Sequence, residues 1–157
     1  MDIEAYFDGL CLPRNPRGIA CFAFVIKKDG KVIHSGSGLA AEPMSEQATN
    51  NVAEYTALLK ALEWLYENGH ATSRVVVIGD SQLVVKQMAG EFRVKNKQII
   101  PLFQKAALMR KKFDDLTIAW VPREQNAEAD RLSERAYNEA ILKDPALLDR
   151  MSRLTQP

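Results

Sequence analysis

The chain has 157 residues, of which 46% are hydrophobic and 26% are charged, so it can form one hydrophobic core but has little room for a second. The 21 Lys and Arg residues nearly balance the 20 Asp and Glu residues, which excludes both a polybasic tail protein and an acidic disordered chain. The longest fully apolar run, residues 19–26, is far shorter than the roughly 20 residues that cross a bilayer, and the acidic start lacks a secretory signal pattern, so we expect a cytoplasmic protein without a membrane partner.

The first part of the chain predicts an antiparallel sheet of three strands. Residues 3–7 alternate well enough for a strand and are followed by an Asp-Gly pair, so we expect the first strand to end at Asp8. Residues 19–28 and 31–39 predict two further strands, because the Asp-Gly pair between them is a strong hairpin signal. A loop rich in Pro and Gly joins the first strand to the second.

Helices and strands alternate in the rest of the chain. Residues 51–66 place apolar side chains at helical intervals, and residues 75–78 form a β-branched run, typical of a strand covered on both faces, that leads into Asp80. The remaining predicted elements are a short helix at residues 81–89, a helix at residues 96–113, a strand at residues 116–121 and a helix at residues 127–142. This order predicts an α/β domain with a five-stranded mixed sheet, in which three antiparallel strands are followed by two strands parallel to the first, flanked by helices.

Positive charge is concentrated in one segment. Residues 86–112 contain eight Lys or Arg residues and one Glu, so the rest of the chain is net acidic. Such a segment suits contact with phosphates, because each Lys or Arg that binds a backbone phosphate releases condensed counterions. A solvated helix face is the simpler interpretation of a charge run, and the segment alone does not decide between the two.

Four carboxylates stand out by their positions. Asp8 and Asp80 each end an apolar strand, and in a parallel pair they emerge at the same edge of the sheet, where ligands of α/β folds bind. Glu54 lies on the apolar face of its helix, where an unpaired carboxylate is costly, so we expect it to be hydrogen-bonded or bound to a cation. Asp130 lies in the first turn of the last helix, where the helix dipole favours negative charge. Taken singly, each acid has a simpler explanation: Asp8-Gly9 as a turn, Glu54 and Asp130 as partners of helix dipoles, and Asp80 as the cap of the helix that follows it.

Taken together, four converging acids predict a metal site. Two carboxylates about 4 Å apart repel each other by about 4 kcal/mol at an effective dielectric constant of 20, and divalent cations would relieve this repulsion. Oxygen ligands favour Mg²⁺ or Mn²⁺, whereas Cys11 and Cys21, which we expect to be reduced thiols, lack partners at metal-ligand spacing. Two ions about 3.5–4 Å apart would clamp the attacking and leaving oxygens of a phosphodiester.

Four short motifs around these acids follow one another along the chain. They are Phe7-Asp8-Gly9 with Cys11 and Asn15-Pro16, Thr49-Asn50-Asn51 with Ala53-Glu54, Gly79-Asp80-Ser81-Gln82, and Trp120-Val121 leading to Asn126-Ala127-Glu128-Ala129-Asp130. With these motifs the sequence closely resembles type 1 ribonuclease H over residues 3–140. The resemblance implies a ribonuclease H-like domain at residues 1–142. In the remaining tail, residues 143–157, apolar side chains recur at helical intervals, so the tail either forms a short helix on the domain or frays.

The resemblance implies an endonuclease that hydrolyses the RNA strand of RNA–DNA hybrids and leaves 5′-phosphate and 3′-hydroxyl ends. The implied catalytic residues, which are also the ligands of two Mg²⁺ ions, are Asp8, Glu54, Asp80 and Asp130. Asp8 would bridge the two ions, one of which activates the attacking water while the other steadies the departing 3′-oxygen, and Mn²⁺ is a plausible substitute. The implied partner is an RNA–DNA hybrid, no obligate protein partner is evident, and we expect a monomer.

The resemblance also assigns substrate contacts. Amide side chains, which both donate and accept hydrogen bonds, suit the 2′-hydroxyl groups of a shallow minor groove. Four such residues match family positions: Asn15, Asn50, Asn51 and Gln82. Thr49 matches a position that holds a phosphate of the DNA strand, and Arg123 lies in the loop before the last acid. Helix capping alone is the alternative for Asn50 and Asn51.

The chain departs from common bacterial members of the family in three places. Residues 90–95 stand where many members carry a longer basic protrusion, and Ala127 stands where the family often has Glu. Residues 121–130 contain Arg123 but no His, whereas many members have a His in this loop; the short loop is more similar to archaeal-type members. The alternative functions are a hybrid-binding domain that has lost catalysis and a nuclease for double-stranded RNA or structured DNA.

Overall fold

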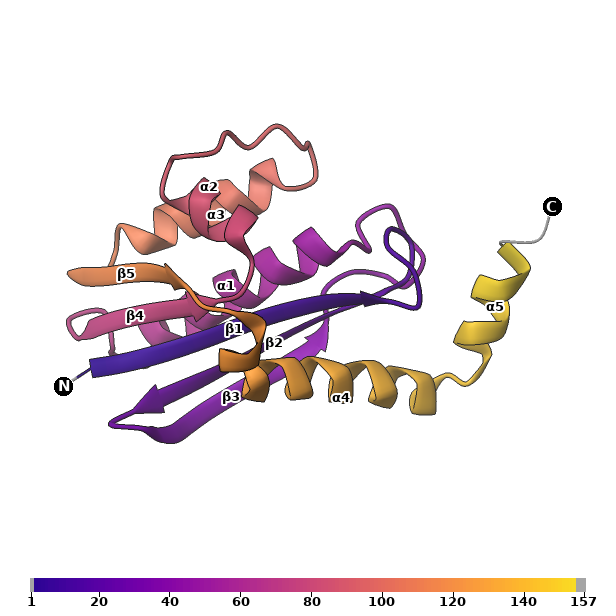
Figure 1. The fold of residues 1–157 in the computed structure, drawn as a ribbon, viewed down its shortest axis with the longest axis horizontal. Coiled ribbons are helices and arrows are strands. Elements are labelled where there is room, and N and C mark those ends of the chain that lie inside the picture. Colours follow the sequence, from indigo (N-terminus) through magenta and orange to yellow (C-terminus); the bar gives the residue numbers. More distant parts are fainter. Residues whose placement is uncertain (1, 155–157) are drawn as a thin grey trace.

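A five-stranded sheet in the order β3-β2-β1-β4-β5 forms the centre of the structure, a computed structural model that describes residues 2–154 (Figure 1). The strands are β1 (Asp2–Leu12), β2 (Ile19–Lys28), β3 (Lys31–Leu39), β4 (Arg74–Gly79) and β5 (Asp115–Trp120). β1, β2 and β3 pair antiparallel, while β4 pairs parallel with β1 and β5 parallel with β4. The predicted mixed sheet is therefore confirmed.

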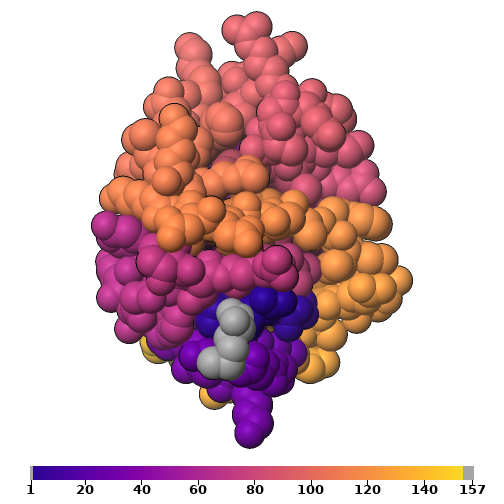
Figure 2. All heavy atoms as spheres, turned by 90° about the vertical axis from the view of Figure 1, so that its left-hand side faces the viewer, coloured from indigo at the N-terminus to yellow at the C-terminus, as the bar shows by residue number. Residues whose placement is uncertain are grey.

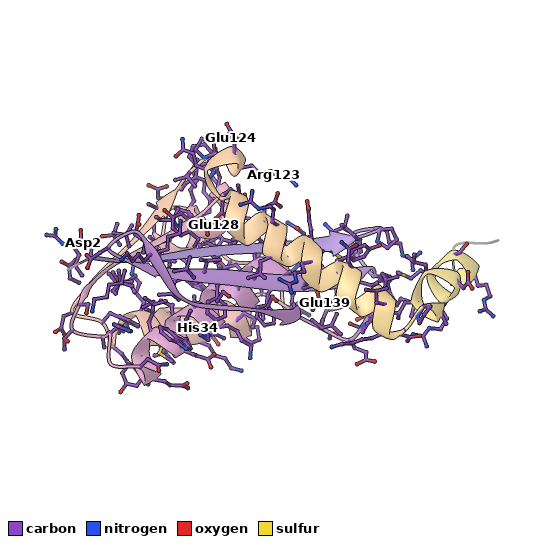
Figure 3. All side chains as sticks on the ribbon, turned by 90° about the horizontal axis from the view of Figure 1, so that it is seen from below. Asp2, His34, Arg123, Glu124, Glu128 and Glu139 are labelled. Carbon is purple, nitrogen blue, oxygen red and sulfur yellow. The ribbon has the colours of Figure 1, made fainter. Side chains whose placement is uncertain are left out.

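Helices cover both faces of this sheet. They are α1 (Asn50–Glu67), α2 (Gln82–Met88), α3 (Ile100–Arg110), the 3₁₀ turn η1 (Arg123–Gln125), α4 (Ala127–Lys143) and α5 (Ala146–Leu154). α1, α2 and α3 lie on one face, and α4 crosses the other, where it packs on β1, β2 and β3 (Figures 1 and 3). Because both faces are covered, the first eight residues of β2 are all buried, which explains their continuous apolar run. β3 is an edge strand and is largely exposed.

β1 is longer than the sequence pattern predicts. It continues through Asp8 to Leu12, so the prediction that the strand ends at Asp8 is wrong. The reason is that its two neighbours differ in length: the antiparallel pairing with β2 extends as far as Leu12 opposite Ile19, whereas the parallel pairing with β4 stops at Phe7 opposite Gly79. Asp8 therefore lies inside β1, but at the level where β4 ends.

α3 is shorter than predicted, spanning Ile100–Arg110 rather than residues 96–113. The Asn96 side chain accepts a hydrogen bond from the backbone N–H of Gln98 at 2.8 Å, a local turn that competes with helix. The chain turns again immediately after Arg110. The segment with residues 86–112 forms one end of the molecule, beyond the edge strand β5, in the space-filling view (Figure 2).

α5 is attached to the α4 side of the sheet. Its Leu147 and Met151 are buried in a small apolar cluster with Ile19, Cys21 and Ala136. Arg150 donates to a carboxylate oxygen of Asp144 at 2.8 Å, just before the helix. Cys21 and Cys11 are both buried free thiols. Within residues 2–154, no helix has the length and apolar character needed to cross a membrane.

Candidate active site

The four predicted carboxylates line one cavity of about 400 Å³ at the end of β4. Asp8 comes from β1, Glu54 from the first turns of α1, Asp80 from the residue after β4, and Asp130 from the first turn of α4. Carboxylate oxygens of Asp8, Glu54 and Asp80 all lie within 4.8 Å of one another. The residues that sequence analysis grouped from distant segments are thus brought together.

Glu54 reaches this cavity because α1 packs unusually close to β1. A Cβ atom on Gly9 would lie 2.4 Å from the backbone nitrogen of Glu54, so only glycine leaves room for this approach. α1 begins at Asn50, where the hydroxyl of the preceding Thr49 accepts a hydrogen bond from the N–H of Val52 at 3.0 Å. Glycine next to Asp8 therefore places two carboxylates from different elements side by side.

Asp80 and Asp130 are fixed by the ends of their own elements. The Ser81 hydroxyl, not Asp80, caps α2 by accepting from the N–H of Val84 at 3.2 Å, so the alternative interpretation of Asp80 as a helix cap is wrong. The indole N–H of Trp120, at the end of β5, donates to the carbonyl oxygen of Asp80 at 3.1 Å. Asp130 is half-buried and belongs to the first turn of α4, as predicted.

Burial and mutual repulsion make these acids harder to ionise. Burial, then the negative charge of Asp80, raises the pKa of Asp8 from 3.8 to about 7. Burial and the neighbouring Asp8 raise the pKa of Glu54 well above its usual value, and its side chain is 3% exposed. Burial also raises the pKa of Asp80, against a hydrogen bond from the Asn126 side chain that lowers it.

A divalent cation fits this arrangement. Within the described part of the chain, Glu54 Oε2 is buried and has no hydrogen-bond partner, a costly state for a carboxylate oxygen. The clustered donor atoms are all carboxylate oxygens, the ligands that hard cations such as Mg²⁺ and Mn²⁺ prefer. The acidic cluster is therefore a candidate metal centre.

Arg123 lies at the rim of the same cavity, in the turn before α4 (Figure 3). One of its guanidinium nitrogens is 3.4 Å from Asp130 Oδ1, and the side chain is 73% exposed. Asp130 is the main cause of a raised pKa of Arg123. An exposed pair of this kind contributes little to stability, so little free energy would be lost if Arg123 contacted another anion instead of Asp130.

The predicted substrate contacts do not all line the acidic cavity. Asn50 lines it, and Asn15 holds the start of α1 by accepting the N–H of Asn50 at 3.0 Å. Asn51 is half-buried, and Gln82 is exposed at the first residue of α2. Thr49 lies instead in a neighbouring cavity of about 460 Å³, whose other lining residues include Arg17, Asn96 and Lys97.

Sequence reasoning missed two residues next to the acids. Asn126 is 1% exposed, and its Nδ2 donates to the carbonyl oxygen of Phe7 at 2.8 Å, directly before Asp8. Glu134 lines the acidic cavity one helical turn after Asp130. The spacing of four residues from Asp130 is the signal that could have identified Glu134. From the sequence alone, Asn126 is indistinguishable from an ordinary helix cap.

Comparison with known proteins identifies relatives of this chain. A sequence profile of the family described as Reverse transcriptase-like matches residues 7–136. The chain is 34% identical to ribonuclease HI of Halobacterium salinarum over 138 residues, which are 88% of this chain and 65% of that protein. It is 35% identical over 116 residues, or 71% of its length, to the bifunctional protein Rv2228c of Mycobacterium tuberculosis, of which it spans 31%.

A solved structure agrees with these sequence matches. LC11-RNase H1, isolated from compost by a metagenomic approach, was crystallised in complex with an RNA/DNA hybrid. It matches the present fold with a TM-score of 0.78 at 34% identity, covering 88% of this chain and 99% of that one.

The sheet order, the helices on both faces and the acidic cavity define the ribonuclease H-like class of α/β proteins. Within that class, the chain belongs to the type 1 ribonuclease H family.

Proposed function

We propose that this protein is an endonuclease that hydrolyses the RNA strand of RNA–DNA hybrids and leaves 5′-phosphate and 3′-hydroxyl ends. The observation that carries the proposal is the meeting of Asp8, Glu54, Asp80 and Asp130 in one cavity. The hybrid bound to the related LC11-RNase H1 supports the choice of substrate. We assign the activity to residues 1–142, and residues 143–157 to a tail.

The four acids would hold two Mg²⁺ ions, for which Mn²⁺ could substitute. Asp8 would be the central ligand, because its carboxylate clusters with those of Glu54 and Asp80 and shares one cavity with Asp130. When bound, such ions supply positive charge to the attacking and departing oxygens of a phosphodiester. Holding the four acids in one cavity also means that little reorganisation is needed when the substrate arrives.

Polar side chains around the cavity would select RNA. Asn50 at the cavity, with Asn15, Asn51 and Gln82 nearby, offers amide donors and acceptors to 2′-hydroxyl groups, the feature that distinguishes RNA from DNA. Thr49, in the neighbouring cavity with Lys97, is suited to a phosphate of the DNA strand. Arg123 would contact a substrate phosphate at the rim of the acidic cavity.

Replacing Asp80 by Asn tests the proposal. We expect Asp80→Asn to lower the rate of hybrid cleavage by more than ~100-fold, because even outer-shell partners of metal sites contribute 10–100-fold. The matched control is Asp115→Asn, an exposed acid at the start of β5 that pairs with Arg74. Both variants should keep the circular dichroism spectrum of the wild type. Cleavage by Asp80→Asn at the control's rate would contradict the assignment.

The same assay separates the alternative functions. Labelled RNA–DNA hybrid, double-stranded RNA and structured DNA are incubated with protein and Mg²⁺ at one fixed salt concentration, and then with excess chelator, because non-specific binding depends steeply on ionic strength. We expect cleavage of the hybrid that stops with chelator. Binding without cleavage would identify a hybrid-binding module, and preferred cleavage of another duplex would change the substrate. The monomeric state and the cytoplasmic location remain predictions.

A further inference from the structure

Asn126 is buried, and its side chain does not form the helix-capping hydrogen bond that its position predicts. It directly precedes α4, where an Asn side chain normally accepts a hydrogen bond from the first turn of the helix. Thr49 and Ser81 do this for α1 and α2. The Asn126 side chain makes no such bond, and within residues 2–154 its Oδ1 is buried without a hydrogen-bond partner.

Its amide group is used for a contact across the fold instead. Nδ2 donates to the carbonyl oxygen of Phe7, 119 positions away in the chain, at 2.8 Å. Phe7 immediately precedes Asp8 and is the last residue of β1 that pairs with β4. The bond therefore ties the start of α4 to the central strand at the point where the acidic cavity begins.

Asn126 also acts on two of the other acids. Its backbone carbonyl accepts the N–H of Asp130 at 3.0 Å, the first helical bond of α4 at this acid. Its side chain lowers the pKa of Asp80, against the effect of burial, and so favours the charged form of that group. Asn126 is thus hydrogen-bonded to the segments that carry Asp8 and Asp130.

A residue selected for helix stability would be oriented differently. Leaving Oδ1 unpaired and the first turn of α4 uncapped both lower the free energy of unfolding. An unsatisfied buried polar atom in a folded protein calls for an explanation, and here the orientation is explained by the hydrogen bond to Phe7. The Asn126 side chain therefore bonds to the central strand beside the acidic cluster instead of capping α4.

We propose that Asn126 is a positioning residue that holds Asp130 in register with Asp8 and so sets the affinity of the cluster for divalent cations. The inference rests on the proposed function in one respect, since it requires the cluster to bind such a cation. It does not require that the protein cleave a hybrid.

The experiment compares three variants by calorimetric titration with Mn²⁺ in the absence of nucleic acid. Asn126→Ala removes the amide. Asn126→Ser restores a hydroxyl that can cap α4 but is too short to reach Phe7. Gln87→Ala is the matched control, because Gln87 is also buried and accepts the Tyr55 hydroxyl at 2.7 Å, away from the acids.

We expect both Asn126 variants to bind Mn²⁺ at least ~10-fold more weakly than the wild type, and Gln87→Ala to bind it normally. Thermal unfolding should show that Gln87→Ala loses at least as much stability as Asn126→Ser, whose α4 is capped again. In hybrid cleavage, high Mn²⁺ should restore the turnover of the Asn126 variants at an unchanged KM for the hybrid.

Wild-type Mn²⁺ affinity in Asn126→Ser would overturn the proposal and leave Asn126 a merely structural residue. A wild-type protein that binds no Mn²⁺ would overturn it as well. A wild-type protein that binds Mn²⁺ but cleaves no hybrid would refute the proposed nuclease while the titration still tests Asn126. If Asn126→Ala does not fold, the capped Asn126→Ser variant decides the outcome.

Discussion

Asp8 occupies the most constrained position among the acids. It lies in the central strand, is 5% exposed and is surrounded by other carboxylates, so its pKa is raised from 3.8 to about 7. A carboxyl whose pKa is higher in the folded state binds its proton more tightly there than in the unfolded chain. The free energy of unfolding contributed by Asp8 is therefore greatest below about pH 4 and decreases as the pH rises toward about 7.

Neutralising Asp8 should stabilise the protein when no metal is bound. We expect Asp8→Asn to raise the free energy of unfolding at pH 8, in excess chelator, by roughly 1–3 kcal/mol, because it removes one buried repulsive charge. Urea unfolding at pH 5 and pH 8 measures the change, which should be smaller at pH 5. Asp115→Asn, on the exposed surface, should leave both values near the wild type. A stability loss in Asp8→Asn at pH 8 would contradict the repulsion.

Proton binding by the same groups predicts the pH dependence of cleavage. Carboxylates must be ionised to bind a metal ion, and the raised pKa values of Asp8, Glu54 and Asp80 make protons strong competitors. At low Mg²⁺, the cleavage rate should rise with pH through about 7, and a tenfold higher Mg²⁺ concentration should move the midpoint to lower pH. Rates measured across pH 5–9 at two Mg²⁺ concentrations test this. A pH midpoint that does not change with the Mg²⁺ concentration would exclude competition between protons and Mg²⁺.

The contact between β1 and α1 determines where Glu54 lies. A Cβ on Gly9 would meet the backbone of α1 at 2.4 Å, and neither element can yield without moving its carboxylate. We expect Gly9→Ala to lower the free energy of unfolding by roughly 1–3 kcal/mol and to weaken Mn²⁺ binding. The control is Gly38→Ala in β3, whose Cβ would lie 3.4 Å from the Phe22 ring, an ordinary contact. Equal effects of the two substitutions would contradict this account.

The elements themselves could be predicted because most of them follow local rules. The buried runs of β2 and β4, the hairpin between β2 and β3, and the apolar stripe of α1 are visible in the sequence, and each is present. The end of β1 could not be predicted, because residues 9–12 remain in the strand only through pairing with β2. The start of α3 was misplaced because the turn at Asn96 depends on a side-chain bond that competes with helix.

The candidate site could be predicted to a similar extent. The positions of Asp8, Glu54, Asp80 and Asp130 at the ends or buried faces of elements indicated one acidic cluster, and they share one cavity. The role of Asn126 could not be predicted, because its partner Phe7 is far away in the chain and nothing local distinguishes it from a helix cap. Separating Thr49 from Asn50 into two cavities likewise requires the fold.

Across the whole molecule, none of the four acids belongs to the apolar cluster that attaches α5, although Leu10 of β1 both packs against that cluster and lines the acidic cavity. Met151 is 3% exposed in the cluster with Ile19 and Cys21, whereas Leu148 on the same helix is 41% exposed. We expect Met151→Ala to lower the free energy of unfolding by roughly 2–4 kcal/mol and Leu148→Ala by less than about 1 kcal/mol. Urea unfolding measures both, and the cleavage rate of the folded variants should stay at the wild-type level. A cleavage defect in Met151→Ala below its unfolding transition would show that α5 supports the site.

β1 is hydrogen-bonded on both sides, to β2 and to β4, up to the residue before Asp8. Strands at the centre of a sheet open to solvent only when the domain opens as a whole, so the amide hydrogens around Asp8 should be among the slowest in the chain to exchange with deuterium. The acidic cluster should therefore not open separately from the rest of the domain. Heat or denaturant should abolish metal binding and cleavage in the same cooperative transition that unfolds the core.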